Sequence, residues 1–165
     1  MRSPAFSGMR DRSAIAGLIP SGDWAVPVAF GFHPLLRLPG VERERWMLEL
    51  PVTSRMLLDD RMLPTGESEQ VEIPSAPLGD RSFDDAFDGF ADPAEFALSG
   101  GSRRLALRLL EGYRFAQVWT PPGGEFVAFE PMTAPANPFE SERTLLAEPG
   151  SRYRARFEIS VTAEP

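Results

Sequence analysis

Proline and glycine interrupt this sequence so often that few regular elements can be long. The chain has 17 Pro and 14 Gly among its 165 residues. Proline is excluded from the interior of helices and of central strands. We find no long stretch with the apolar spacing of an amphipathic helix. The sequence therefore predicts many short strands joined by turns.

Between these breaks, apolar and polar residues tend to alternate. Every second residue from Tyr153 to Val161 is apolar, which is the period of a strand with one buried face. We expect further strands at 26–34, 45–51 and 69–74. Two hairpins are also expected, with turns at 99–102 and 121–124.

The expected architecture is all-β, an antiparallel β-sandwich formed by one domain. This domain is expected to span residues 21–165. Residues 1–20 show no clear period, so we expect a poorly structured arm there. A chain of 165 residues is long enough to bury a sizeable core.

Several residue types that catalysis often requires are missing. The sequence has no Cys, and all 17 of its basic residues are Arg, which excludes thiol nucleophiles, Cys-ligated metals and Schiff-base lysines. His33 is the only histidine, so the usual zinc sites with several histidines are excluded. We expect no cofactor and no metal.

The net charge of the chain limits the classes of partner that it can bind. The net charge is −7 and the pI is near 4.8, which argues against binding to a phosphate backbone. No apolar run reaches the length of a membrane span, and the N-terminal residues do not form a signal peptide. We expect a soluble cytoplasmic protein with neither a nucleic acid nor a membrane partner.

Two titratable residues occupy similar positions in the sequence. His33 and Glu130 each end a predicted strand and each precede a proline, which favours an extended backbone at that position. Glu130 shares its face with the small Ala128, so there is room beside its carboxylate. A carboxylate in such a place should have a raised pKa, which suits a general base. The sequence does not place the two residues together, and either one could also be an ordinary surface residue.

An acidic segment, residues 82–95, offers further candidates. Its spacing partly matches a calcium-binding loop, but Ala86 stands where a ligand is needed. We expect a polar turn here, in which Asp84 or Asp85 could accept hydrogen bonds from sugar hydroxyls. The aromatic residues that could stack on a sugar ring are Trp46 and Trp119.

The order of several motifs resembles the aldose 1-epimerase (galactose mutarotase-like) family. These motifs are VPVAFGFHPLLRLPG, LPTGE, FDDAF, VAFEPMTAPANPF and LLAEPGSRYRARFEISV. The resemblance extends from about Ser21 to Ala163 and corresponds to the C-terminal half of family members. The unmatched half supplies an arginine and a second histidine that contact the sugar. The fold that it implies is the family's large antiparallel sandwich, incomplete at its N-terminus.

The resemblance also implies an activity and a role for each site residue. The family interconverts the α and β anomers of a hexose without a cofactor. By this resemblance His33 is the general acid that protonates the ring oxygen, and Glu130 is the general base at the C1 hydroxyl. Asp84 matches the sugar-binding aspartate, with Asp85 as the substitute if the register shifts by one.

Three other interpretations remain open. The chain could be a carbohydrate-binding or degenerate protein that binds sugar without turnover. It could be a glycosidase that uses Glu130 with Asp84 or Asp85, which requires two carboxyl groups at a defined separation. It could act on a hexose phosphate, given an arginine cluster near the cleft. Candidates for that cluster are Arg37, Arg81, Arg103 and Arg104. Open sheet edges would favour a homo-oligomer.

Overall fold

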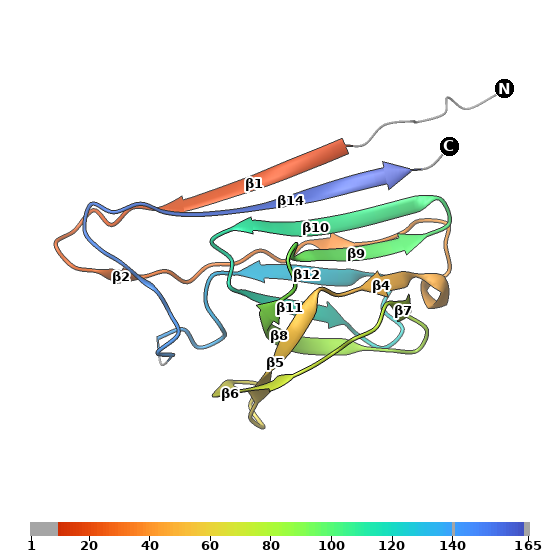
Figure 1. Cartoon of the computed structure of the whole chain (residues 1–165), viewed down its shortest axis with the longest axis horizontal. Coiled ribbons are helices and arrows are strands. Elements are labelled where there is room, and N and C mark those ends of the chain that lie inside the picture. The colour runs from red at the N-terminus through yellow and green to blue at the C-terminus, as the bar shows by residue number, and fades with distance from the viewer. Residues whose placement is uncertain (1–9, 140, 164–165) are drawn as a thin grey trace.

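Two six-stranded antiparallel sheets make up most of this structure, a computed structural model that describes residues 10–139 and 141–163 (Figure 1). The first sheet has the order β1 (Arg10–Leu18), β14 (Tyr153–Ala163), β10 (Arg103–Glu111), β9 (Glu95–Gly100), β4 (Met47–Glu49) and β7 (Ala76–Pro77). The second has the order β3 (Leu35–Leu36), β12 (Val127–Met132), β11 (Phe115–Thr120), β8 (Phe83–Phe90), β5 (Val52–Leu58) and β6 (Pro64–Gln70).

Two smaller elements complete the described fold. Strands β2 (Val26–Pro27) and β13 (Leu146–Ala147) form a two-stranded sheet, and η1 (Arg43–Arg45) is a single 3₁₀ turn. The prediction of an all-β antiparallel sandwich is confirmed. Among the residues described, no helix is long and apolar enough to cross a membrane.

The core lies between the two large sheets. The first sheet contributes Phe96 and Leu107, and the second contributes Phe87, Val118 and Phe129, all of them almost fully buried. Alternation along each strand sends every second side chain into this core. On β12, β11 and β8 the remaining side chains therefore point to the opposite face of the second sheet.

Several strand predictions are confirmed. Strand β14 pairs with β10 on one side, and its apolar residues Ala155 and Phe157 are buried. The two predicted hairpins are β9–β10 and β11–β12. Gly101 has φ of +61° in the first hairpin turn, a conformation that glycine adopts without strain.

The prediction of a poorly structured arm over residues 1–20 is wrong for residues 10–18. These residues form β1, which pairs with β14 from Arg10↔Val161 to Leu18↔Tyr153. The backbone hydrogen bonds of this pairing stabilise a strand whose own side chains give only a weak pattern. Residues 1–9 lie outside the described part of the chain.

Three other local predictions need correction. Of residues 26–34, only Val26–Pro27 forms a regular strand. The rest of the segment makes an isolated bridge from Gly31 to Met132 instead of a continuous strand pairing. The strand expected at 69–74 ends at Gln70, and residues 71–74 are not strand. The segment read as a polar turn contains the strand β8, which is stabilised by pairing with β11 and β5.

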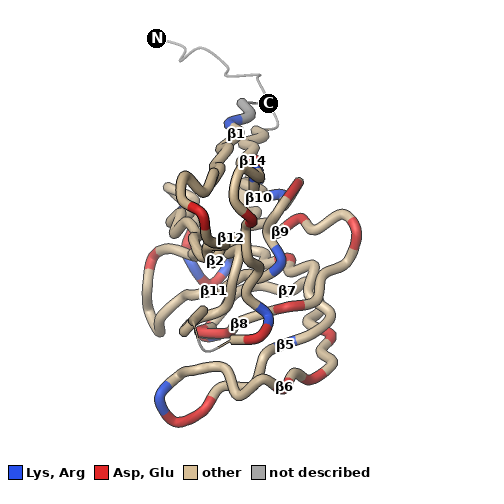
Figure 2. Tube along the Cα trace, turned by 90° about the vertical axis from the view of Figure 1, so that its left-hand side faces the viewer, with Lys and Arg blue, Asp and Glu red and all other residues tan. Residues whose placement is uncertain are grey.

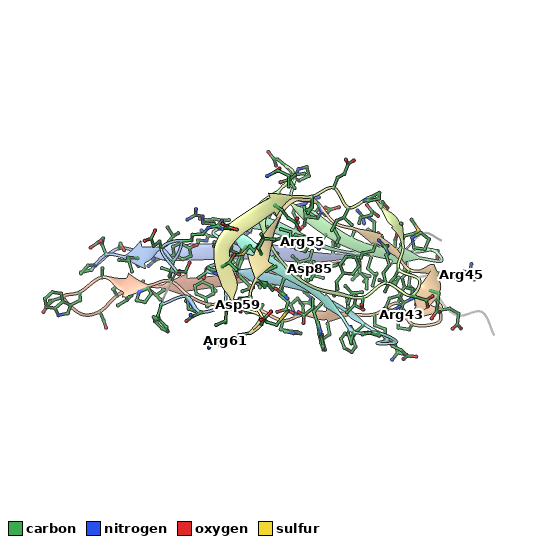
Figure 3. The ribbon with its side chains drawn as sticks, turned by 90° about the horizontal axis from the view of Figure 1, so that it is seen from below. Arg43, Arg45, Arg55, Asp59, Arg61 and Asp85 are labelled. Carbon is green, nitrogen blue, oxygen red and sulfur yellow. The ribbon has the colours of Figure 1, made fainter. Side chains whose placement is uncertain are left out.

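The buried Arg43 forms hydrogen bonds to several loops at one end of the second sheet (Figure 3). Arg43 donates hydrogen bonds to the carbonyl oxygens of Gly124 at 2.7 Å and Arg81 at 2.8 Å, and also to that of Gly79. Because Gly124 belongs to the β11–β12 turn, Arg43 fixes the end of that hairpin. The β5–β6 hairpin projects from the sandwich (Figure 2).

Candidate functional site

Three neighbouring strands present the candidate residues on the outer face of the second sheet. In the register of these strands, Glu130 of β12 lies opposite Gln117 of β11, and Trp119 of β11 lies opposite Asp84 of β8. Facing pairs in a sheet point to the same side. The alternation that buries Phe129 in the core therefore brings these four side chains to one surface.

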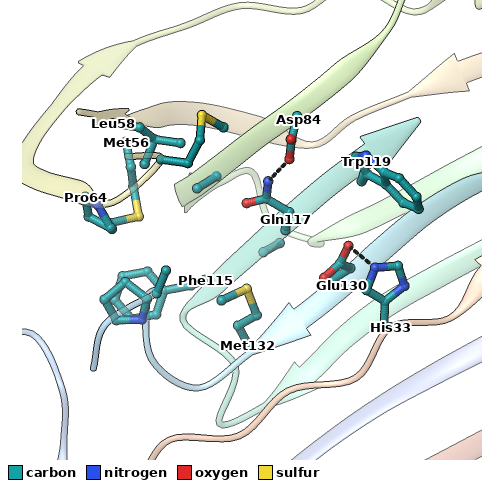
Figure 4. A pocket seen from close by; sticks show the side chains of 15 residues that line it. His33, Met56, Leu58, Pro64, Asp84, Phe115, Gln117, Trp119, Glu130 and Met132 are labelled. Atoms are coloured by element: carbon teal, nitrogen blue, oxygen red, sulfur yellow. Dashed lines mark hydrogen bonds and ion pairs between the residues drawn. The ribbon is translucent and has the colours of Figure 1, made fainter. Parts of the chain in front are cut away.

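These four side chains line a cavity of about 400 Å³ (Figure 4). One wall comes from the β5–β6 hairpin, including Met56 and Pro64, and another comes from the loop after β12, including Pro135 and Ala136. His33 closes the cavity at the end near Glu130 (Figure 4). A concave site with a few convergent polar groups in a largely apolar lining is typical of small-molecule binding.

His33 reaches the cavity because its segment lies against β12. Gly31 makes an isolated bridge to Met132, and the amide of Phe32 donates to the carbonyl of Pro131 at 3.1 Å. A Cβ atom on Gly31 would lie 2.9 Å from that carbonyl oxygen, so the close approach requires glycine. The bridge positions His33, two residues further on, beside Glu130.

Thr133 is the second attachment point of this segment. Its side chain is fully buried, and its hydroxyl accepts a hydrogen bond from the amide of Phe30 at 2.9 Å. The same hydroxyl can donate to the carbonyl of Phe30 at 3.0 Å, and the amide of Thr133 donates to that carbonyl at 2.9 Å. Thr133 therefore supplies bonds that a regular strand pairing would otherwise make.

His33 and Glu130 are in direct contact, with Nε2 of His33 3.0 Å from Oε1 of Glu130. The histidine side chain is 52% exposed and the glutamate 15%, so one partner faces solvent and the other is enclosed. The His33 ring meets Trp119 edge to face, with 5.6 Å between ring centroids. The sequence predicted each residue as a candidate, and the structure brings them together.

The surroundings of Glu130 raise its pKa. Burial raises the pKa of Glu130 above its ordinary value, the nearby His33 lowers it, and the negative charge of Asp84 raises it again. The net shift is upward because burial is the largest effect. A carboxyl group with such a pKa is suited to take up and release protons nearer neutral pH.

The structure separates the two aspartate candidates. Asp84 lines the cavity, and its Oδ1 accepts a hydrogen bond from Nε2 of Gln117 at 2.7 Å. Asp85 points to the other face of β8, where Arg55 donates to it at 3.1 Å (Figure 3). Asp85 is not part of the cavity lining, so it is not placed to contact a ligand there.

Gln117 and Trp119 complete the polar end of the cavity. Sequence reasoning did not identify Gln117 as a candidate. The feature that could have identified it is its position on β11 directly opposite Glu130 of β12. Of the two tryptophans proposed for stacking, Trp119 lines the cavity, whereas Trp46 is buried in the core.

The arginines proposed for a phosphate group are engaged elsewhere. Arg37 pairs with Glu125 at 2.7 Å, and Arg104 pairs with Glu49 and Glu95. Arg81 and Arg103 donate to backbone carbonyls. None of the four lines the cavity. Within the described residues, no group of three or more His, Asp or Glu could hold a metal ion.

Taken together, the fold and the site define a class of protein: an antiparallel β-sandwich with a contacting histidine and glutamate and other hydrogen-bonding groups in a cavity on one sheet. Comparison with protein families identifies the class more closely, because the model of the family described as aldose 1-epimerase matches residues 20–160. The chain belongs to the aldose 1-epimerase family. A comparison with curated protein sequences finds no significant match.

Solved structures have the same fold at low sequence identity. A galactose mutarotase-like protein from Clostridium acetobutylicum has a TM-score of 0.81 at 13% identity, over 92% of this chain and 52% of that one. The Slr1438 protein from Synechocystis sp. PCC 6803 has a TM-score of 0.74 at 23% identity, over 93% and 51%. A galactose 1-epimerase from Lactobacillus acidophilus NCFM has a TM-score of 0.71 at 13% identity, over 94% and 54%. The chain thus spans about half the length of these proteins.

Proposed function

We propose that this chain is an aldose 1-epimerase that interconverts the α and β anomers of a free hexose. The observation that carries the proposal is the contact of His33 with Glu130 in a cavity that also holds the Asp84–Gln117 pair. Anomer exchange requires one group that removes a proton from the C1 hydroxyl and one that gives a proton to the ring oxygen. Membership of the family supports this choice among the reactions such a pair could perform.

In the proposed reaction, the carboxylate of Glu130 takes the proton of the C1 hydroxyl, and protonated His33 gives its Nε2 proton to the ring oxygen. The bond from C1 to the ring oxygen breaks, its electron pair stays on that oxygen, and C1 becomes a carbonyl. Rotation about C1–C2 then presents the other face of the carbonyl. On closure, His33 recovers its proton from the attacking hydroxyl, and Glu130 returns its proton to the C1 oxygen.

The contact between the two side chains is compatible with this sequence of proton transfers. The C1 hydroxyl oxygen and the ring oxygen are bonded to the same carbon, so they are close neighbours. A sugar that enters the cavity can therefore replace the His33–Glu130 contact with one hydrogen bond to each side chain. Asp84 and Gln117 would then hold ring hydroxyls, and Trp119 would cover an apolar part of the ring.

The test is the exchange rate between anomers, measured by NMR exchange spectroscopy on equilibrated glucose and galactose. We expect the wild-type protein to accelerate exchange and Glu130→Gln to lower the acceleration by about 10²–10⁴-fold. Glu125→Gln is the matched control, because that carboxylate pairs with Arg37 outside the cavity. Wild-type protein that is folded and leaves the exchange rate at its value in buffer would contradict the proposal.

A second candidate is sugar binding without turnover. It is favoured by the His33–Glu130 contact itself, which occupies both reacting groups until a ligand separates them. Calorimetry and the exchange assay together distinguish the two functions. Both proteins would release heat with a hexose, but a protein that only binds would leave anomer exchange unchanged. A glycosidase that pairs Glu130 with Asp85 is less compatible with the site, since Asp85 lies on the other face of β8. The pairing of Glu130 with Asp84, which shares the cavity, stays a prediction.

A further inference from the structure

The cavity extends well beyond the residues that the proposed reaction uses. The polar groups lie at one end, around His33 and Glu130, and the opposite end is formed by Met56, Pro64 and Phe115 (Figure 4). A hexose carries hydroxyl groups around most of its ring. A hydroxyl buried against this apolar end would lose its hydrogen bonds to water without replacement. The apolar end is therefore poorly suited to an unsubstituted sugar edge.

A second cavity of about 380 Å³ adjoins the apolar end. The two cavities share Met56, Pro64 and Ala136, which are remote from the acid/base pair. The second cavity is more polar, and its lining includes Thr65 from β6 and Ser141 from the loop after β12. Two polar regions are thus joined by an apolar passage.

The charges around the second cavity are balanced. Arg143 lines it, but Nη1 of Arg143 lies 2.6 Å from Oδ2 of Asp88, and the guanidinium group also lies over the ring of Phe115 at 4.9 Å. The lining also includes the acidic Glu142. A phosphate group would have to compete with the carboxylate of Asp88 and approach that of Glu142. The second cavity therefore favours a neutral, hydroxyl-rich group over an anion.

We infer that the second cavity is a subsite for a second, uncharged sugar ring, so that the preferred substrate is the reducing end of a disaccharide or longer oligosaccharide. The inference rests on the proposed function, which places C1 of the reducing ring at His33 and Glu130. The ring carbon opposite C1 is C4, so a 1,4-linkage directs the second ring away from these residues. The linkage region, which has few hydroxyls, then lies in the apolar passage.

The experiment compares kcat/KM for anomer exchange between sugars of one series, measured by NMR exchange on the full chain. Maltose and cellobiose carry the 1,4-linkage, isomaltose carries a 1,6-linkage, and glucose and glucose 6-phosphate are single rings. We expect the 1,4-linked disaccharides to exceed glucose by roughly tenfold, the effect of a few additional contacts. Isomaltose and glucose 6-phosphate should not exceed glucose.

Two substitutions test the location of the subsite from opposite walls. Thr65→Tyr on β6 and Ser141→Trp on the loop should each fill the second cavity and reduce the disaccharide-to-glucose ratio to near one. Gln70→Tyr is the matched control, because Gln70 belongs to β6 but lies outside both cavity linings. The two walls belong to different segments, so a folding defect in one variant leaves the other as a test.

The outcomes separate this inference from the proposed function. Equal values for glucose and the 1,4-linked disaccharides, or ratios unchanged in both variants, would overturn the subsite and leave the epimerase assignment intact. A preference for glucose 6-phosphate would overturn the choice of a neutral ring. If no sugar is turned over, calorimetry decides: tighter binding of maltose than of glucose, lost in both variants, supports the subsite, and equal binding refutes it.

Discussion

Replacing Thr133 with Val should loosen the segment that carries His33. Valine has nearly the same shape as threonine but has no hydroxyl, so the amide of Phe30 loses its acceptor at 2.9 Å. An unsatisfied buried donor costs about 1–3 kcal/mol. The hydrogen bond from the Thr133 hydroxyl to the Phe30 carbonyl contributes about 0.5–1.5 kcal/mol more. Because the Phe30 amide is only part-buried, we expect a total near the lower part of this range, about 2 kcal/mol.

The assay is thermal unfolding together with hydrogen exchange at the Phe30 amide. A loss of this size should lower Tm by roughly 4–8 °C for a chain of this length. Thr133→Ser is the matched control, because it keeps the hydroxyl and removes one methyl group, worth about 0.8 kcal/mol. The Phe30 amide should exchange faster in the Val variant than in the Ser variant. If Ser destabilises as much as Val and the amide stays protected in both, packing rather than hydrogen bonding holds this segment.

Three further substitutions test other parts of the site. Gly31→Ala should cost about 1–3 kcal/mol in unfolding free energy, because its Cβ would meet the Pro131 carbonyl at 2.9 Å; an unchanged Tm would refute this close approach. Burial raises the pKa of Glu130, so its contribution to stability is present at low pH and is lost as pH rises through that pKa. Glu130→Gln should therefore gain Tm relative to wild type as pH rises, and a constant difference would contradict the shift. Burial opposes ionisation of Asp88, but hydrogen bonds, including one from Arg143, outweigh it and hold the pKa of Asp88 below its ordinary value. The stability that this lowered pKa provides is lost as pH falls through it. Asp88→Asn should therefore reduce the unfolding free energy by about 1–3 kcal/mol at neutral pH, and the two proteins should become equally stable in acid. A difference in stability that persists in acid would point to packing.

The parts of the fold that follow from local pattern were predictable from the sequence. Strand β14 alternates strictly, and the β11–β12 hairpin is marked by its turn, so both could be read directly. The position of Glu130 on the face opposite Phe129 follows from the same alternation. Asp84 and Asp85 could not be separated in this way, because only the register with β11 shows which one faces the cavity.

The missed elements depend on contacts between distant segments. Strand β1 contains the small residues Ala14 and Ala16 and becomes a strand through its pairing with β14. The meeting of His33 with Glu130 depends on Thr133, which bonds a residue 103 positions away. Neither the β1–β14 pairing nor the His33–Glu130 contact leaves a pattern in the local sequence. Sequence reasoning could therefore identify the two site residues as candidates but could not predict that they are in contact.

The position of the chain's only histidine has a practical consequence. Because His33 is the sole imidazole, its ring C–H resonances in a proton spectrum need no assignment by mutagenesis. The neighbouring ring of Trp119 lies 5.6 Å away and imposes its ring current on these signals. Any ligand that separates His33 from Glu130, or that displaces the indole, should move them. The molecule therefore carries its own spectroscopic reporter at the place where the proposed chemistry occurs.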